Sequence, residues 1–171
     1  RSMAARSGPK SIATSSATSA IEILECERAI RHLRQSLHAC IGLRQRAGRF
    51  GAHRLERSLD PVWVDADETR MEQIVANLVV NALKFTPAGG TIGVSVQRMG
   101  GDAVLEVRDT GIGMSEELRG RAFELFVQGD AALDRGKGGL GIRLTLVRRL
   151  AELHGGTASA ASDGPGKGAS F

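Results

Sequence analysis

Two asparagines and a lysine occur at helical spacing in the stretch NLVVNALKF, as Asn77, Asn81 and Lys84. At 3.6 residues per turn these side chains lie in a row on one face of a helix, away from the apolar Leu78 and Val79. Asn is a poor helix former, so two in one row are unusual on a plain solvated face. Amide oxygens followed by an ammonium group suit a hydrated Mg²⁺ and the phosphates that it bridges. Taken alone, the row would be interpreted as a polar surface stripe.

Asp109 ends the alternating stretch DAVLEVRD, in which Leu105 and Val107 share its face. Because the apolar face should meet the helices, we expect Asp109 to point inward. A buried carboxylate is costly unless it accepts hydrogen bonds, and the exocyclic amine of a purine would supply one. Gly111 and Gly113 would let a flat ring approach the backbone closely. Taken alone, Asp109 is also consistent with an aspartate that starts a turn.

The stretch GKGGLGIRLTLV places Gly136, Gly138 and Gly141 in a G-x-G-x-x-G spacing before an amphipathic helix. A dinucleotide-binding loop would follow a strand directly and precede an acidic-ended strand, and neither is found here. The G-K-[ST] sequence of a Walker A loop is also absent from the chain. Backbone N–H groups at a helix N-terminus still form a good anion site. A flexible hinge stays open as the alternative for this stretch.

Periodicity defines the elements that must position these residues. Helices are predicted over about 19–46, from 65–67 to about 85, as one or two turns in 115–126, and from about 140 to 153. Strands are predicted as two short stretches in 53–64, at 91–99, at 102–109 and in 157–162, with a hairpin through Gly100-Gly101. This order predicts an α+β fold: a two-layer α/β sandwich with a mixed, mostly antiparallel sheet covered on one face by about three helices. The polar stretch 127–139 is long enough to be a lid.

The composition limits the classes of protein. The 171 residues are 42% hydrophobic and 25% charged, which is typical of a globular domain with its own core. Cys26, Cys40 and the four histidines lack ligand spacing, so we expect neither a disulfide framework nor a structural metal. The net charge of +4 includes arginines clustered in the N-terminal third, but the chain has no tyrosine to stack on bases. We therefore expect no nucleic acid partner, and residues 1–18 are predicted to be a flexible lead-in or linker to one domain, 19–171.

Taken in order, NLVVNALKFTPAGG, DTGIGM, FELFVQ and GGLGI…LAELHGG resemble the N, G1, F and G2 boxes of sensor histidine kinases. That family shares the Bergerat-type ATP-binding fold with gyrase, Hsp90 and MutL (the GHKL group), and the resemblance runs from about Ile21 to Phe171. It implies ATP bound with Mg²⁺ between helices and sheet, under a mobile lid. It also implies a cytoplasmic protein histidine kinase in two-component signalling. The partners implied are a dimerisation domain of the parent kinase, which carries the phosphoacceptor histidine, and the receiver domain of a response regulator.

The resemblance assigns roles to the polar row. Asn81 should bind Mg²⁺ through its amide oxygen. Asn77 and Lys84 should meet the phosphates and serve as the catalytic residues. ATPases of the wider group carry a water-activating Glu where Asn77 stands, and an amide cannot be a general base. This departure fits phosphoryl transfer with slow hydrolysis.

The resemblance also assigns the residues around the base and the lid. Asp109 should accept a hydrogen bond from the adenine amino group, with Gly111 and Gly113 lining the ring. Ser170 matches a hydroxyl position that reaches adenine through water. The remaining nucleotide-binding residues belong to the lid and its junction with the following helix: Lys137, Gly139, Leu140 and Gly141.

Three departures qualify the resemblance. His32 and His38 lack the residues of a histidine box, so the phosphoacceptor is expected outside this chain. The sequence ends at Phe171, where the family continues into a last strand, so we expect that strand to be truncated. Arg143 stands where the family has Gly, Ala or Ser. Arg143 could fold over the phosphates or turn outward and hold the lid open, and the outward position is the one expected from the sequence.

A serine kinase of the anti-sigma-factor type and a nucleotide-binding scaffold without catalysis stay as alternative functions.

Overall fold

The computed structural model describes residues 53–62, 64–125, 127 and 141–171. The predicted helix over 19–46 and nearly all of the predicted lid lie outside the described residues. The described elements are β1 (Arg54–Leu59), α2 (Glu68–Phe85), β2 (Thr91–Met99), β3 (Asp102–Asp109), α3 (Glu116–Arg121), α5 (Arg143–Leu153) and β4 (Ala169–Ser170).

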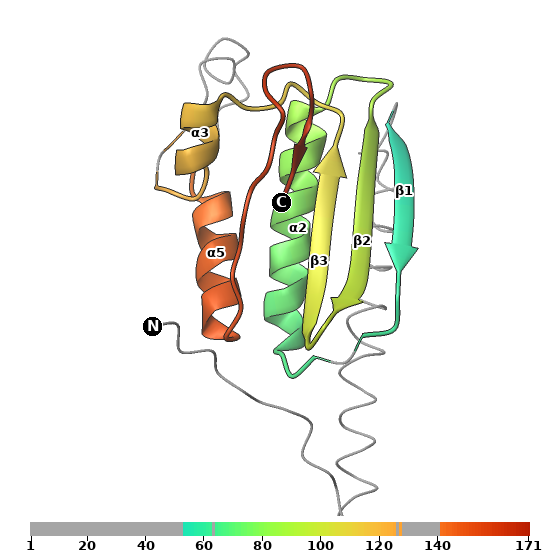
Figure 1. Ribbon diagram of the computed structural model, residues 1–171, viewed down its shortest axis with the longest axis vertical. Helices are drawn as coiled ribbons and strands as arrows, with labels where there is room; N and C mark the ends of the chain where they lie inside the picture. The colour runs from blue at the N-terminus through green and yellow to red at the C-terminus, as the bar shows by residue number, and fades with distance from the viewer. Residues whose placement is uncertain (1–52, 63, 126, 128–140) are drawn as a thin grey trace, which may run out of the picture.

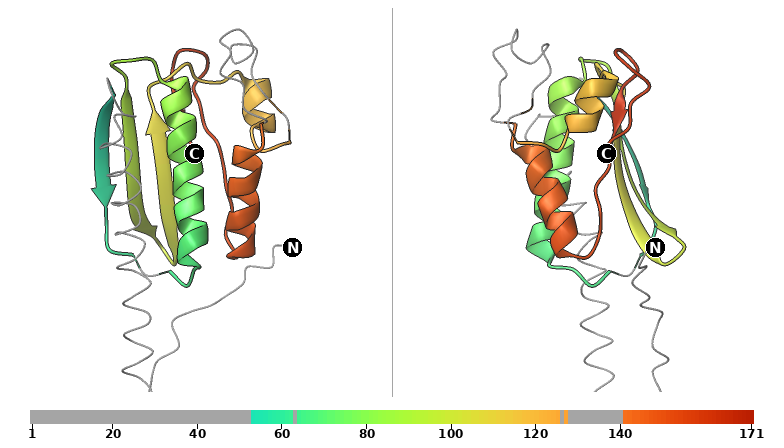
Figure 2. Two further views of the ribbon diagram at one scale, coloured as in Figure 1. Left: turned by 180° about the vertical axis from the view of Figure 1, so that it is seen from behind. Right: turned by 60° about the vertical axis from the view of Figure 1, so that its left-hand side comes forward.

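The four strands form one mixed sheet in the order β1-β2-β3-β4. β1 pairs with β2 in parallel, whereas β2 with β3 and β3 with β4 pair antiparallel. The described helices lie on one side of this sheet, and α2 and α5 run side by side in opposite directions (Figures 1 and 2). The predicted two-layer α+β sandwich is confirmed. Among the described residues, no helix is both long and apolar enough to span a bilayer.

Helix α2 begins and ends where local chemistry favours it. The side chain of Asp67 accepts a hydrogen bond from the N–H of Arg70 at 2.9 Å, which caps the first turn. At the other end, the hydroxyl of Thr86 donates to the carbonyl of Ala82 at 2.7 Å. The inner face of α2 packs against the inward residues of β2 and β3 and against α5, and the buried set comprises Ile74, Val75, Leu78, Val79, Ala82, Ile92, Val94, Val96, Val107, Val147 and Leu150.

The hairpin of β2 and β3 has the predicted bounds, and Gly100 supplies the positive φ of 63° at its turn. The prediction of two strands in 53–64 is wrong for the described residues, because only β1 forms there. The last ladder bond runs from the N–H of Asp60 to the carbonyl of Val96, and Pro61 has no N–H to continue it.

Two further boundaries differ from prediction. The stretch 157–162 contributes only an isolated bridge, between Ala161 and Ser170, because β4 offers it a partner just two residues long. Helix α5 begins at Arg143 rather than at about 140. Gly141 has a left-handed φ of 66°, which no α-helix can include, so the helix starts after it.

Candidate functional site

The polar row predicted on α2 forms one part of the candidate site. Asn77, Asn81 and Lys84 are all partly buried on this helix, whose neighbour in space is α5. No group of three His, Cys, Asp or Glu that could hold a metal occurs in the described part of the chain. A divalent ion at Asn81 would have room for ligands from phosphates and water. Mg²⁺ commonly binds in this way, so the donor set fits the predicted role.

Lys84 ends this row as a partly buried cation. Its ammonium lies 4.7 Å from the centroid of the Phe85 ring, and no carboxylate of the described residues pairs with it. Burial lowers the pKa of Lys84, and the charge of Arg143 lowers this pKa further. An anion would relieve both effects, because it would attract the ammonium that burial and Arg143 disfavour.

Asp109 ends β3 as a buried carboxylate with 5% of its surface exposed. Its Oδ1 accepts a hydrogen bond from the N–H of Gly111 at 2.8 Å. Burial raises the pKa of Asp109, while the N–H groups of Gly111 and Ala169 oppose that rise. A carboxylate has about four lone-pair sites, so acceptor capacity is left for a ligand that donates. The inward orientation predicted from the strand alternation is confirmed.

The two glycines after Asp109 are required by the protein's own packing. A Cβ at Gly111 would overlap with the carbonyl oxygen of Phe85, at the end of α2. A Cβ at Gly113 would overlap with the carbonyl oxygen of Gly164, and Gly113 also has a positive φ of 65°. Their role in lining a purine stays a prediction, and the backbone contacts provide a second reason for glycine at both positions.

Ser170 does not lie with Asp109. In the register of β3 and β4, Ser170 stands opposite Arg108, while Ala169 stands opposite Asp109. Directly opposed residues of an antiparallel pair point to the same face of the sheet. The hydroxyl of Ser170 is therefore directed to the face away from the helices, and Ala169 is the residue on the face of Asp109.

The structure describes only the end of the predicted lid-to-helix junction. Lys137, Gly139 and Leu140 lie outside the described residues, whereas Gly141 directly precedes Ile142, the N-cap of α5. Ile142 provides no side-chain cap, so the first N–H groups of α5 have no side-chain acceptor there. These groups remain candidates for an anionic ligand.

Comparisons with known proteins agree with this arrangement. A family model described as histidine kinase-, DNA gyrase B- and HSP90-like ATPase matches residues 66–171. The histidine protein kinase DivJ of Caulobacter vibrioides is 40% identical over 139 residues, an alignment that covers 79% of this chain and 23% of DivJ.

Solved structures of histidine kinases also resemble this chain in fold. The mycobacterial sensor histidine kinase MprB matches with a TM-score of 0.66 at 25% identity, covering 82% of this chain and 88% of that one. Full-length ShkA, solved in complex with AMPPNP, matches with a TM-score of 0.64 at 28% identity, covering 84% of this chain and 28% of ShkA. The chain thus spans only a minor part of the length of DivJ or ShkA.

Proposed function

This chain belongs to the family of histidine kinase-, DNA gyrase B- and HSP90-like ATPases, and from that premise we propose that it binds ATP with Mg²⁺ and transfers the γ-phosphoryl group to a histidine on a separate dimerisation domain. It is an ATP-binding catalytic domain of the sensor histidine kinase type, from two-component signalling. The transfer, the metal and the partners are the proposal.

The observation that carries the proposal is the buried carboxylate of Asp109, beside a loop that is anchored to the end of α2. The adenine amine donates a hydrogen bond to this carboxylate, and a purine with a carbonyl at the same position cannot. The site therefore selects adenine over guanine. The complex of ShkA with AMPPNP, an adenine nucleotide analogue, supports this choice of ligand.

The phosphates meet the polar row of α2. Asn81 would hold Mg²⁺ through its amide oxygen, and this residue would thereby bring a charge-neutralising ion to the triphosphate. Lys84 adds a protein cation to the same phosphates, and Asn77 binds them through its amide. Because Asn77 cannot remove a proton from water, the domain favours transfer to an imidazole over hydrolysis. Catalysis then consists of positioning the phosphoryl donor and stabilising its charge.

Other predicted residues extend this site. We infer that Lys137, Gly139, Leu140 and Gly141 close over the phosphates. The receiver domain of a response regulator would accept the phosphoryl group from the dimerisation domain. A cytoplasmic location follows from the need for ATP and for that receiver.

Labelled ATP, mixed with this chain and with the dimerisation domain of the parent protein, tests the proposal. We expect acid-labile phosphate on the dimerisation domain and none on this chain. Acid-stable phosphate on a serine would instead identify a serine kinase. ATP binding without any transfer would identify a scaffold, and either result would overturn the proposed histidine kinase activity.

A further inference from the structure

The loop that follows Asp109, residues 111–114, is held from two sides by hydrogen bonds. On one side, the N–H of Ile112 donates to the carbonyl of Phe85, the last residue of α2, at 3.1 Å. On the other side lies the stretch 162–168, which precedes β4 and is here called the C-terminal loop. Its Gly166 N–H donates to the carbonyl of Ile112 at 2.7 Å. The loop after Asp109 is thus enclosed between α2 and a segment about fifty residues later in the chain.

The two loops also touch through their backbones. The N–H of Gly168 donates to the carbonyl of Gly111 at 3.1 Å. A Cβ at Gly168 would overlap with the carbonyl oxygen of Asp109, and φ at Gly168 is 72°. Since Gly113 likewise has no room beside Gly164, the contact allows little relative movement while it is formed.

One side chain completes this contact. The Oγ of Ser162 accepts a hydrogen bond from the N–H of Met114 at 3.0 Å and donates one to the carbonyl of Gly168 at 2.7 Å. A hydroxyl can do both, because it has one proton and two lone pairs. Ser162 therefore links the far end of the loop after Asp109 to the residue whose backbone packs on Asp109.

We propose that Ser162 is a positioning residue for adenine recognition, whose hydroxyl locks the loop after Asp109 against the C-terminal loop. The inference rests on the proposed nucleotide site, where the purine amine donates to Asp109. The hydrogen bonds of Ser162 reach the base side of that site and not the row of Asn77, Asn81 and Lys84 on α2. The hydroxyl should therefore affect binding of the base and leave binding of the phosphates unchanged.

Removal of the hydroxyl gives the first arm of the test. In Ser162→Ala, the N–H of Met114 loses its acceptor and the carbonyl of Gly168 loses its donor. We expect the affinity for ATP to fall about tenfold, since the loss of these two partly buried hydrogen bonds should have an effect of this order. Discrimination between ATP and GTP should fall with it. The affinity for inorganic tripolyphosphate, which has no base, should stay unchanged, and Ser162→Thr should retain most of the ATP affinity.

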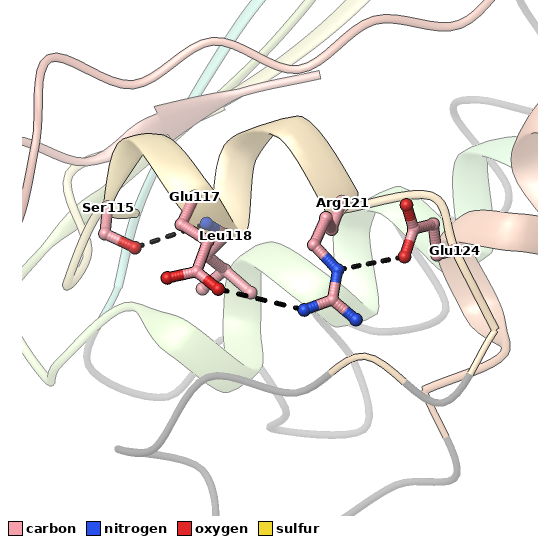
Figure 3. Close-up of polar contacts among 5 residues, drawn as sticks. All are labelled: Ser115, Glu117, Leu118, Arg121 and Glu124. Atoms are coloured by element: carbon pink, nitrogen blue, oxygen red, sulfur yellow. Dashed lines mark hydrogen bonds and ion pairs between the residues drawn. The ribbon is translucent and has the colours of Figure 1, made fainter.

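Ser115 offers a matched control one residue beyond Met114. Its Oγ accepts from the N–H of Leu118 at 3.2 Å and caps α3 (Figure 3). Among the described residues, no hydrogen bond joins this Oγ to the C-terminal loop. Ser115→Ala removes the same hydroxyl and one local hydrogen bond, at a comparable cost to stability of about 1 kcal/mol. We expect it to leave the affinities for ATP and tripolyphosphate unchanged. Thermal unfolding of both variants identifies any general loss of structure.

The outcomes distinguish the proposed function of the chain from the positioning role of Ser162. Failure of the wild-type chain to bind ATP overturns the proposed function. ATP binding by the wild type that is unchanged in Ser162→Ala overturns the inference and leaves the proposed function standing. Equal losses for ATP and tripolyphosphate, or equal losses in Ser115→Ala, also overturn it, because they indicate a merely structural role.

If the Ser162→Ala variant does not fold, a second measurement on the wild-type chain still tests the inference. Amide hydrogen exchange of the wild-type chain reports directly on Met114, Gly166 and Gly168. We expect ATP to slow exchange at these three amides and tripolyphosphate to leave them unchanged. Equal protection by both ligands would overturn the inference.

Discussion

The carboxylate of Asp109 and the backbone N–H of Gly111 form a hydrogen bond of 2.8 Å at the buried end of β3. This bond fixes the direction of the carboxylate, since the acceptor and donor are only two residues apart. The position of Gly111 is itself fixed, because its backbone lies so close to the carbonyl oxygen of Phe85 that a Cβ would overlap with it. One local interaction thus orients the group on which the proposed recognition of adenine depends. It also leaves the charge buried with few donors, which is a cost that a bound purine would offset.

Replacement of Asp109 by Ala should remove the acceptor for the purine amine. A hydrogen bond to a charged group contributes roughly 1.5–3 kcal/mol, so we expect ATP affinity to fall by at least about tenfold. Calorimetry with ATP and GTP measures this loss and the preference of the wild type for adenine. Equal affinity of the wild-type chain for the two nucleotides would contradict the adenine assignment.

Asp109→Asn should change how the stability of the chain depends on pH. Burial raises the pKa of Asp109 in the folded chain. The stability that this group contributes is therefore complete below its ordinary pKa of about 3.9, and it is lost as pH rises through the higher folded value. The Asn variant lacks this titration, and its amide oxygen can still accept from Gly111. We expect its free energy of unfolding to exceed that of the wild type at pH 7, by a margin that shrinks towards pH 4. Urea denaturation at several pH values measures the margin, and a constant margin would argue against the assigned pKa shift.

Asn81→Ala should weaken ATP binding mainly when Mg²⁺ is present. The amide oxygen is the proposed metal ligand, so its loss should lower the Mg²⁺-dependent affinity by at least about fivefold. Binding measured in EDTA is the internal control and should change little. If the affinity falls equally in EDTA and in Mg²⁺, Asn81 is not a metal ligand.

The parts of the fold that depend on neighbours in sequence were predictable. β2 and β3 have the predicted bounds because their alternation and the Gly100-Gly101 turn are local signals. Helix α2 could be located because Asp67 caps it and its apolar residues repeat with the helical period. The sequence also indicated the inward orientation of Asp109, since a strand alternates its faces.

Contacts between distant segments were not predictable in the same way. Ser162 meets Met114 across 48 residues, and no local pattern indicates that pairing. The position of Ser170 was assigned from resemblance, but the register of β4 directs it away from Asp109. The sequence held a signal for this orientation, because Phe171 is apolar and strand alternation then places Ala169 inward and Ser170 outward. In the structure, Phe171 indeed packs inward against Phe123.

Arg143 is the residue for which the structure adds an observation on charge, while its expected effect on the lid stays a prediction because residues 128–140 lie outside the described residues. The sequence favoured an outward side chain that holds the lid open. In the structure Arg143 is exposed on the first turn of α5, yet its charge is close enough to lower the pKa of Lys84. Lys84 and Arg143 are therefore two cations whose charges interact, and neither has a carboxylate partner among the described residues. Phosphate oxygens would relieve this repulsion, which favours Arg143 as a second phosphate-binding cation.

Arg143→Gln should accordingly weaken ATP binding, by about threefold to fivefold because the guanidinium is exposed to solvent. The matched control is Arg149→Gln on the same helix, since Arg149 is also exposed and pairs with Glu152 at 3.6 Å. It removes the same charge and should leave ATP affinity unchanged.

Loss of Arg143 should also raise the pKa of Lys84. Because only the charged amine attracts phosphate, ATP affinity falls as pH rises through that pKa, and in Arg143→Gln this fall should move to higher pH. Calorimetry between pH 7 and about pH 10 measures both effects. Tighter ATP binding by Arg143→Gln would instead support the outward position expected from the sequence.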